Sequence, residues 1–544
     1  MDGVGVSRSD APSVRRGSAA GRLGLAVASG LLVASAFPPL DLGWVAFIGW
    51  VPLFLSLSGA GPREAARLGF AGGLAFYLTT IWWVINTMTT YGGMPLGLSL
   101  VALLLLAAVL AGYTAAFAWL VATGEGRLPL PVWLRPTLAA ILWTALELAR
   151  TYLFSGFPWA LLGYTQHREP TVRLLAAAVG VYGVSALVML VNGTIAALLR
   201  RLVRRGSGEG SARDALVAIG IAALVVLATV GYGRGIWQDP TGGPAVRVGL
   251  LQGNIDQTIK WDRRFQVATL ETYERLGRRV AAERPALIVW PETAVPFILR
   301  REPELSPRVG RYVAETGVPM LIGSPDAGAD GRLYNTAFLV GTDGGILGRY
   351  DKRHLVPFGE YVPLQRAFFF LDKLVTGIGD FGRGRKATVF GGAGPAFSVM
   401  ICYEVIFPAE VREFVRAGAT YLVNITNDAW FGRSGAPSQH LAMAAMRAVE
   451  NGSYLVRAAN TGISAVIAPT GEILARTEIF TEAAFVGTIR ARQAETPYTR
   501  YGDVLAWACL VCSMGYAAAL LWSLRRSSLR APTAETRRYS AFCL

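Results

Sequence analysis

Cysteine and histidine are scarce in this chain. Its 544 residues include four cysteines and three histidines. So few cysteines over this length imply no disulfide framework. Cys509 and Cys512 form a CxxC pattern, but they lie inside an apolar stretch, so we interpret them as small packing residues rather than a zinc or redox site. The sequence therefore predicts no metal site and no cofactor.

Charged residues are also few, at 16% of the chain, whereas 53% of the residues are hydrophobic and the mean hydropathy is +0.40. These values are typical of membrane proteins. The net charge of +15 could indicate nucleic-acid binding. However, arginines cluster beside apolar runs, within 200–205 and 525–530, where they fit topology determinants better. We therefore expect a membrane-embedded protein with no nucleic-acid partner.

Eight apolar stretches have the length needed to cross a bilayer. They cover residues 21–39, 42–60, 66–88, 96–122, 135–153, 171–199, 214–234 and 504–523. The first contains Ala34-Ser35-Ala36, which resembles a signal-peptidase site. Because Pro38 and Pro39 follow at once and another span begins near Leu42, we favour a retained helix over a cleaved signal.

Basic residues fall on alternate connections between these spans, which places those connections in the cytoplasm. The connection between the fifth and sixth spans, with His167 and Arg168, is the exception. Five regions follow from this pattern. They are a polar tail (1–20), a seven-helix transmembrane domain (21–235), an extracytoplasmic domain (236–500), an eighth transmembrane helix (501–524) and a cytoplasmic tail (525–544).

Two features of the membrane part exceed what a simple span needs. Glu147 and Arg150 lie three residues apart on one helix face, where we expect either a packing ion pair or a functional one. The connection from Phe154 to Tyr164 is aromatic and amphipathic, which predicts a position in the membrane interface.

The predicted outer domain alternates strands with helices. Its strands cover 246–251, 286–290, 319–322, 338–340, 346–348, 397–401, 421–425 and 454–456. Residues 262–283 form a charged helix with an apolar stripe. Hairpin turns are expected at Asp343-Gly344-Gly345 and at Pro469-Thr470-Gly471. This pattern predicts an α/β sandwich with mixed sheets.

Reactive side chains follow three of these strands. Cys402 ends an apolar strand, Glu292 follows another through Pro291, and Lys352 follows a hairpin strand. A nucleophilic thiol needs a base, which a carboxylate can provide, and a lysine can stabilise a thiolate or an oxyanion. Spacing alone does not bring the three together, and Cys402 could instead be a packed core cysteine.

Three motifs resemble those of the nitrilase (carbon–nitrogen hydrolase) superfamily. They are Trp290-Pro291-Glu292, the stretch from Tyr350 to Glu360 containing Lys352, and Cys402-Tyr403-Glu404. With seven spans before and one after, the whole chain resembles the bacterial apolipoprotein N-acyltransferases. This resemblance also rests on Gln252-Gly253-Asn254-Ile255 with Trp261, and on residues 427–432.

The resemblance implies an αββα sandwich and a Glu-Lys-Cys catalytic triad in the inner membrane, with the catalytic domain outside the cytoplasm. Cys402 would take an acyl chain from the sn-1 ester of a phospholipid, with Glu292 as base and Lys352 stabilising the tetrahedral intermediate. The acceptor would be the α-amino group of a diacylglyceryl-cysteine apolipoprotein. Glu360, Glu404 and Tyr403 would support the triad.

The remaining candidates concern substrate binding. Trp430 and Phe431 belong to the last of these motifs, Trp261 could shape the entrance or pack in the core, and His440 could line the pocket. His354 is expected to be structural. Phe368 and Phe369 lie in a glycine-rich stretch and predict either core packing or a lid that dips into the membrane.

Two other classes of function remain open from the residues. A membrane-tethered amidase or nitrilase would use the same triad with water as acceptor, but would not need so large a membrane part. A sensor or transporter would use the spans, but would leave the three strand-end residues unexplained.

Overall fold

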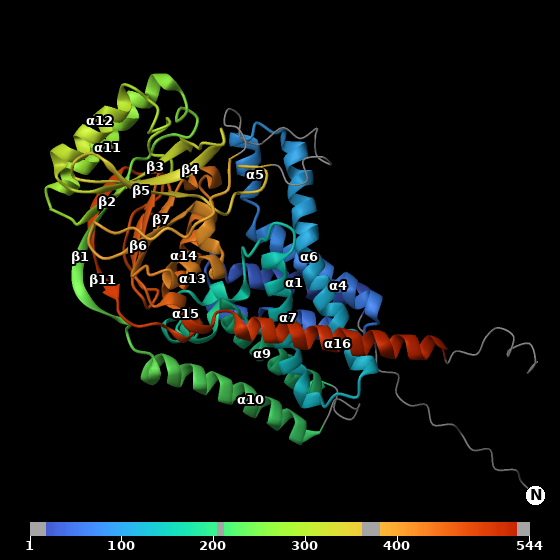
Figure 1. Cartoon of the computed structure of the whole chain (residues 1–544). Helices are drawn as coiled ribbons and strands as arrows, with labels where there is room; N and C mark the ends of the chain where they lie inside the picture. The colour runs from blue at the N-terminus through green and yellow to red at the C-terminus, as the bar shows by residue number, and fades with distance from the viewer. Residues whose placement is uncertain (1–17, 204–210, 362–380, 530–544) are drawn as a thin grey trace, which may run out of the picture.

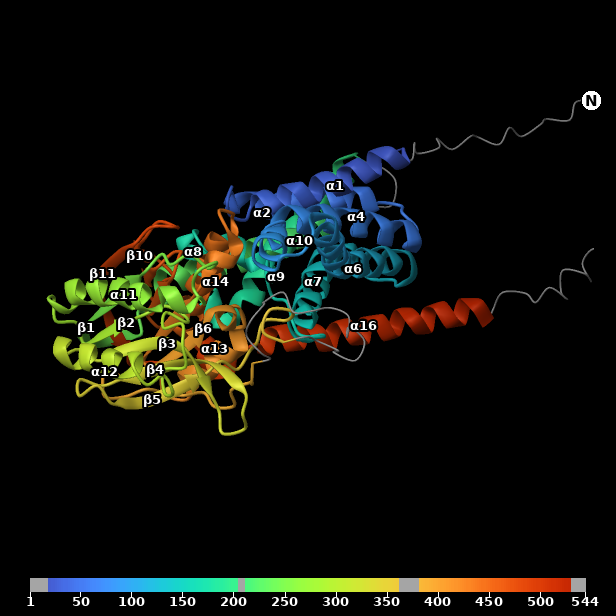
Figure 2. The same cartoon turned by 90° about the horizontal axis from the view of Figure 1, so that it is seen from above.

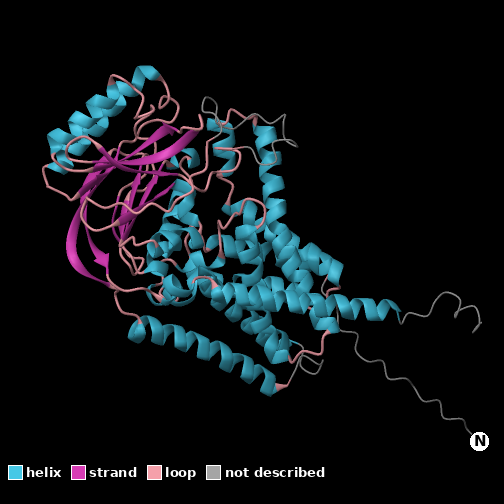
Figure 3. Cartoon of the chain, viewed as in Figure 1, coloured by secondary structure: helices cyan, strands magenta, loops and turns pink. Residues whose placement is uncertain are grey.

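The computed structural model describes residues 18–203, 211–361 and 381–529. A bundle of helices lies beside a domain that contains all the strands (Figures 1 and 3). The bundle is built from the N-terminal part of the chain and from the helix near its C-terminus. The strands and their covering helices come from the segment between them.

The helical part contains long apolar helices with short pieces between them. Its α-helices are α1 (Ala19–Ser35), α2 (Ala46–Gly49), α3 (Val51–Leu57), α4 (Pro62–Thr80), α5 (Val84–Asn86), α6 (Leu96–Arg127), α7 (Arg135–Tyr152), α8 (Pro170–Arg173), α9 (Ala176–Val203), α10 (Ala212–Gly231) and α16 (Val504–Leu529). A π-helical turn, Thr87–Tyr91, follows α5.

Five of the described helices are long and apolar enough to cross a membrane, and a bent pair makes a sixth. The five contain α6, α7, α9, α10 and α16, which correspond to five of the expected spans. The pair joins Pro62–Thr80 to Val84–Tyr91 at an angle of 59°. The first two expected spans appear as shorter apolar helices, Ala19–Ser35 and Gly43–Leu57. The helical membrane part is thus confirmed, but eight full spans are not.

The α/β domain follows α10. Its elements are β1 (Thr241–Gln252), α11 (Gln266–Ala281), β2 (Leu287–Val289), α12 (Leu305–Thr316), β3 (Met320–Ala327), β4 (Leu333–Val340), β5 (Ile346–Asp351), β6 (Phe397–Ile401), α13 (Pro408–Arg416), β7 (Tyr421–Thr426), α14 (Ala436–Asn451), β8 (Leu455–Ala459), β9 (Ala465–Ile467), β10 (Ile473–Arg476), β11 (Ala483–Arg492) and α15 (Pro497–Tyr501). All eight strands expected from the sequence are present, as are both hairpins and the charged helix.

The strands form two sheets. One has the order β11-β1-β2-β3-β4-β5 and the other the order β10-β9-β8-β7-β6. Each sheet contains three neighbouring parallel strands, β1-β2-β3 and β6-β7-β8, with antiparallel strands beside them. Apolar side chains such as Leu250, Val399 and Val423 pack into one core cluster that the two sheets share. The mixed α/β sandwich is therefore confirmed.

Helices cover both outer faces of the sandwich. A second core cluster, including Leu270, Trp290 and Val313, joins α11 and α12 to the six-stranded sheet. On the other side, α13 and α14 lie between the strands and the membrane helices (Figures 1 and 2). This arrangement gives the αββα layers and places the five-stranded sheet closer to the membrane part.

The carboxyl ends of the parallel strands carry the polar residues that the motifs contain. Glu292 follows β2, Cys402 follows β6, and Asn427 follows β7. Cys402 and Asn427 follow neighbouring parallel strands of one sheet, so they lie at the same edge. Glu292 follows a strand of the other sheet and reaches this edge through its contact with Asn427.

Candidate active site

Cys402 lies where β6 ends and a short 3-10 helix, Cys402–Ile406, begins. Its φ angle is 53°, a left-handed conformation that is uncommon for a residue other than glycine. Its side chain is 9% exposed. A sharp turn directly after a buried strand places the thiol at the strand end, where Cys402 also belongs to the main core cluster.

Glu292 is held by donors from three other segments. Asn335 Nδ2 on β4 donates to Glu292 Oε1 at 2.7 Å, and Lys352 Nζ approaches the same oxygen at 3.4 Å. The backbone amide of Asn427 donates to Glu292 Oε2 at 2.9 Å. These contacts fix the carboxylate in one orientation at the meeting point of the two sheets.

Lys352 is buried between two carboxylates. Its Nζ lies 2.9 Å from Glu360 Oε1 and 3.4 Å from Glu292 Oε1. Glu360 Oε2 in turn accepts from the amide of Val356 at 2.8 Å, which closes the loop after Lys352. Glu292 and Lys352 therefore contact each other, with Glu360 beside them.

Burial and the neighbouring charges set the ionisation of Cys402 and Lys352. Burial and the Glu292 carboxylate raise the pKa of the Cys402 thiol, and Lys352 opposes them only in part. Burial alone would lower the pKa of Lys352, but Glu360 and Glu292 outweigh it and raise that pKa. At neutral pH the site therefore holds a neutral thiol beside a charged ammonium group, so the thiol needs a base before it can attack.

Glu404 joins the Cys402 strand to the segment that follows Lys352. Its carboxylate accepts hydrogen bonds from Tyr350 Oη and from the amides of Ile401 and Arg353, each at 2.6 Å. Burial raises the pKa of Glu404 to about 7. Tyr403 turns the other way, and its hydroxyl donates to the carbonyl of Gly156 at 3.4 Å. Glu404 thus contacts the catalytic domain and Tyr403 the membrane part.

His440 lies beneath the cysteine rather than on an open surface. It is fully buried, and its Nε2 lies 3.3 Å from the carbonyl of Cys402. Arg457 Nη2 donates to His440 Nδ1 at 2.9 Å and to Asp428 Oδ2 at 2.7 Å. Burial and Arg457 lower the pKa of His440, so the ring is neutral at pH 7, and its Nδ1 also lies 3.1 Å from Asp428 Oδ1.

Sequence reasoning did not single out several residues that contact the site. Lys260 is 2% exposed and its Nζ donates to the carbonyl of Glu292 at 3.1 Å. Burial lowers the pKa of Lys260 to about 8. Asn335 contacts both Glu292 and Glu360. The one sequence signal for Lys260 was its position directly before Trp261, whereas Asn335 lies in a strand without any motif.

Two of the predicted substrate-binding residues contact the membrane part. The ring of Phe431 packs 4.7 Å from Trp83 and 5.7 Å from Trp159, and the ring of Trp430 lies 5.3 Å from Tyr91. Trp261 is half-buried beside Lys260. Phe368 and Phe369, with the predicted lid, lie outside the described residues.

The aromatic connection after α7 is held between the two parts. Glu147 and Arg150 form an ion pair at 4.0 Å, but each forms a shorter hydrogen bond to the backbone of this connection. Glu147 Oε1 accepts from the amide of Leu162 at 2.7 Å, and Arg150 donates to the carbonyl of Trp159 at 2.9 Å. Phe154 is 93% exposed, whereas Trp159 is buried, so the connection reaches from the surface into the protein.

Within the described residues, the His354 side chain and the CxxC cysteines make no hydrogen bond to Glu292, Lys352 or Cys402. His354 Nδ1 pairs with Glu410 at 2.7 Å, and its ring stacks on Phe407. On α16, Cys509 is buried and Cys512 is exposed, and both are free thiols. No group of three metal-ligating side chains is present in the described part of the chain.

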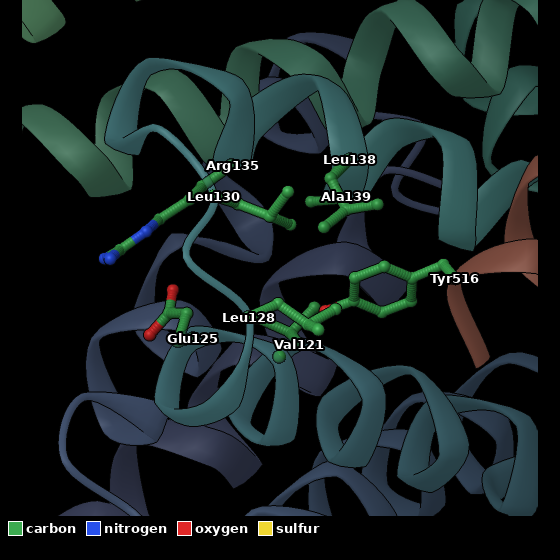
Figure 4. Close-up of a pocket in the computed structure, with 9 residues that line it drawn as sticks. Val121, Glu125, Leu128, Leu130, Arg135, Leu138, Ala139 and Tyr516 are labelled. Carbon is green, nitrogen blue, oxygen red and sulfur yellow. The ribbon is translucent and has the colours of Figure 1, made fainter. Parts of the chain in front are cut away.

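Two cavities border the helical part. The smaller one lies between α6, α7 and α16, and Tyr516 reaches into it beside Val121 and Leu128 (Figure 4). Its volume of about 20 Å³ suits a single water molecule. The larger one, about 550 Å³, lies between the end of α7 and the segments around His354 and Phe407. Only the larger cavity is wide enough for part of a lipid.

The two-sheet fold and the strand-end cysteine define a member of the carbon–nitrogen hydrolase class, and the carbon-nitrogen hydrolase family model matches residues 247–498. A second model, the apolipoprotein N-acyltransferase N-terminal domain, matches residues 29–194. The chain therefore belongs to the apolipoprotein N-acyltransferase family, as its motifs predicted.

Similar proteins cover nearly the whole chain. An apolipoprotein N-acyltransferase of Geobacter metallireducens is 42% identical over 514 residues, which are 93% of this chain and 96% of the relative. One from Methylococcus capsulatus is 36% identical, with the same shares covered. Among solved structures, an amidase from Nesterenkonia sp. AN1 matches 48% of this chain and 95% of its own, with a TM-score of 0.36 and 20% identity.

Proposed function

We propose that this protein moves an acyl chain from the sn-1 position of a phospholipid to the N-terminal amine of a diacylglyceryl-cysteine apolipoprotein. Its relatives across both parts of the chain are apolipoprotein N-acyltransferases. The observation that supports this chemistry best is the contact of Lys352 with Glu292 and Glu360. Lys352 is also close enough to Cys402 for each to affect the ionisation of the other.

In the first half-reaction, Glu292 accepts the proton of the Cys402 thiol while the sulfur attacks the ester carbonyl carbon. The ammonium group of Lys352 stabilises the negative charge that develops on the carbonyl oxygen. The C–O ester bond then breaks, and the leaving oxygen takes the proton from Glu292. The products are a lysophospholipid and an S-acyl thioester on Cys402.

In the second half-reaction, the apolipoprotein amine attacks the thioester carbonyl, and Glu292 accepts a proton from the attacking nitrogen. The C–S bond breaks, an amide forms, and the proton returns to the sulfur of Cys402. A thioester suits this step because it reacts readily with an amine. The cycle is a ping-pong transfer in which Glu292 acts alternately as base and acid.

The surrounding residues have supporting roles in this proposal. Glu360 and Asn335 orient Lys352 and Glu292, whereas Glu404 and His440 hold the backbone on either side of the Cys402 sulfur. Trp430, Phe431 and Trp261 border the substrate path. Since both substrates are lipids, the helical part brings the reacting groups to the membrane surface.

The orientation is part of the same proposal. The catalytic domain lies outside the cytoplasm, because the arginine-rich connections fall on one side. Eight crossings require α1 and the Gly43–Leu57 helix to span as well; at about 1.5 Å per residue, the 17 residues of α1 reach about 26 Å. An exposed position, Ala329, suits a cysteine label in intact cells. We expect an impermeant reagent to label Ala329→Cys in intact cells. Labelling only after lysis would show that the catalytic domain lies on the cytoplasmic side.

Intact-mass analysis tests the proposed chemistry. Incubation with phospholipid alone should add one acyl chain to the wild-type protein and none to Cys402→Ala, and addition of an apolipoprotein should remove the adduct. A tethered amidase would return free fatty acid and leave the apolipoprotein unmodified. Absence of any adduct in the wild-type protein would refute the thioester route.

A further inference from the structure

The larger cavity lies at the junction between the membrane part and the catalytic domain. The end of α7 and the residues after it form one wall, with Tyr152, Phe154 and Ser155. The catalytic domain forms the other wall, with Arg353, Arg383 and Arg385 among its side chains. The reaction chemistry described above uses none of these six residues.

The catalytic wall carries an excess of positive charge. Three arginines line the cavity against one acidic residue, Glu410, and the carboxylate of Glu410 already pairs with His354 at 2.7 Å. Arg353 Nη2 pairs with Glu413, but its Nη1 is buried and has no hydrogen-bond partner. Its guanidinium group lies 5.7 Å from the Phe414 ring, so Arg353 contributes positive charge to this wall rather than an open donor.

The backbone that carries Arg383 and Arg385 is hydrogen-bonded to the segment of Lys352 and Glu360. The amide of Gly384 donates to the carbonyl of Lys352 at 2.8 Å, and the amide of Phe381 donates to the carbonyl of Glu360 at 3.1 Å. Both arginine side chains are exposed, and within the described part of the chain neither forms an ion pair. The backbone of this stretch is therefore anchored to the Lys352 segment, and the two guanidinium groups are exposed to an anion, that of Arg383 lying 5.0 Å from the Tyr361 ring.

The opposite wall carries two aromatic side chains, Tyr152 and Phe154, beside Thr151 and Ser155. Tyr152 and Phe154 are 48% and 93% exposed at the end of a helix long and apolar enough to cross a membrane. Aromatic and aliphatic side chains at such a position contact acyl chains and the headgroup boundary. The cavity thus places two exposed aromatic side chains opposite a cationic wall, an arrangement that suits an anionic amphiphile.

The cavity also lies close to the nucleophile. His354, which lines it, places its ring 5.7 Å from that of Tyr403, and Phe407 packs 5.2 Å from the same ring. Tyr403 directly follows Cys402 in the chain. A ligand in the cavity is therefore separated from the cysteine by the Tyr403 side chain.

We infer that this cavity binds the phosphodiester group of the phospholipid acyl donor, through Arg353, Arg383 and Arg385. The inference rests on the proposed function, in which a phospholipid is the donor. The acceptor described there carries a diacylglyceryl group without a phosphate, so the arginines select the donor. Guanidinium groups suit this role because their paired donors match phosphate oxygens.

The test compares acyl-enzyme formation from short-chain phosphatidylglycerol in the wild-type protein and in Arg383→Gln with Arg385→Gln. Loss of two charged contacts should raise the KM for the phospholipid roughly tenfold or more while the maximal rate changes little. Alkylation of Cys402 by iodoacetamide, which needs no phosphate contact, should keep its wild-type rate. Arg301→Gln with Arg311→Gln removes the same charge from exposed positions outside the cavity and should leave the KM unchanged.

A second variant separates charge from folding. Arg383→Lys with Arg385→Lys keeps both charges and should recover most of the lost affinity. A wild-type KM in the glutamine variant, or an equal defect in the lysine variant, would overturn the inference. If the wild-type protein forms no adduct from phospholipid at all, the proposed function is refuted, and so is the phosphate site that depends on it.

Discussion

Glu292 acts on Cys402 in two opposing ways. Its negative charge raises the pKa of the thiol, yet in the proposed mechanism its carboxylate is the base that the thiol needs. Replacing Glu292 by glutamine separates these effects. In Glu292→Gln we expect acyl-enzyme formation to fall by about 10²–10⁴-fold, because the proton acceptor is lost.

The same substitution should make the thiol easier to ionise. Without the carboxylate charge, the pKa of Cys402 falls toward its ordinary value, so the midpoint of iodoacetamide alkylation should move to lower pH. Mass spectrometry of both reactions across a pH series measures the two effects, with substitution of the exposed Glu271 on α11 by glutamine as control. Wild-type acylation in Glu292→Gln would remove this residue from the mechanism.

Lys260 gives the folded protein a specific dependence on pH. Burial lowers its pKa from 10.5 to about 8, so the folded chain binds this proton less readily than the unfolded chain. Stability from this group is therefore full above pH 10.5 and is lost as the pH falls toward 8. Lys260→Met has no such group. As the pH falls from 10 to 8, the wild-type protein should therefore lose about 2 kcal/mol more of its free energy of unfolding than Lys260→Met does.

Thermal unfolding in detergent at several pH values measures this difference. Lys386→Met is the matched control, because Lys386 is exposed. If the difference between Lys260→Met and wild type does not change with pH, Lys260 is not a buried titrating group.

The motifs predicted the residues that follow strand ends, because a strand end is visible in a sequence. The motifs drew attention to Glu292, Lys352 and Cys402, and in the structure Lys352 contacts Glu292. Lys260 and Asn335 were not predicted as site residues, because their contacts depend on the approach of segments far apart in the chain. Lys260, for example, meets the backbone of a residue 32 positions away.

At the scale of elements, residues 381–384 form a strap whose amides donate to the carbonyls of Glu360, Lys352 and Leu333. A Cβ atom on Gly384 would lie 1.9 Å from the carbonyl oxygen of Asp351, so no side chain fits there. In Gly384→Ala we expect the strap to move away from Lys352, acyl-enzyme formation to fall at least tenfold, and the melting temperature to drop by a few degrees.

Gly391→Ala is the control for this prediction, because no atom lies within 4 Å of a Cβ at that position. It should match wild type in both acylation and thermal stability. Normal activity in Gly384→Ala would mean that the strap does not position Lys352.

Element boundaries were predictable where the pattern was regular. The apolar strands and the charged helix stood out by their periodicity. The early spans did not, because mean hydropathy is insensitive to breaks in a helix. Residues 42–60 contain separate short helices, and the third expected span bends between Thr80 and Val84. The sequence also left α12 and β11 unassigned, since neither carries a motif.

At the scale of the whole molecule, Gln439 on α14 connects three segments of the membrane part to the catalytic domain. Its Oε1 accepts from Trp159 Nε1 at 2.7 Å, and its Nε2 donates to the carbonyls of Pro38 and Thr80 at 2.9 and 3.1 Å. Gln439→Leu leaves these buried groups without partners, which should cost about 2–4 kcal/mol of stability.

Thermal unfolding with separate probes for the two parts tests this role. Gln439→Leu should lower the melting temperature and let the catalytic domain and the helices unfold at different temperatures. Gln266→Leu removes one hydrogen bond within the catalytic domain and should keep a single transition. A single, unshifted transition in Gln439→Leu would show that the junction does not depend on this residue. The sequence did not predict this junction, because α14 carries no signal for which face meets the membrane helices.

The burial of α14 bears on how this protein can be handled in the laboratory. Fifteen of its sixteen residues are buried, since the sandwich covers one side and membrane helices such as α9 cover the other. A recombinant fragment of residues 236–500 would expose that second side, with Phe431, to water. Such a fragment should aggregate or require detergent, even though it contains every residue of the proposed triad. Inhibitor screening therefore calls for the full-length protein in a membrane mimic.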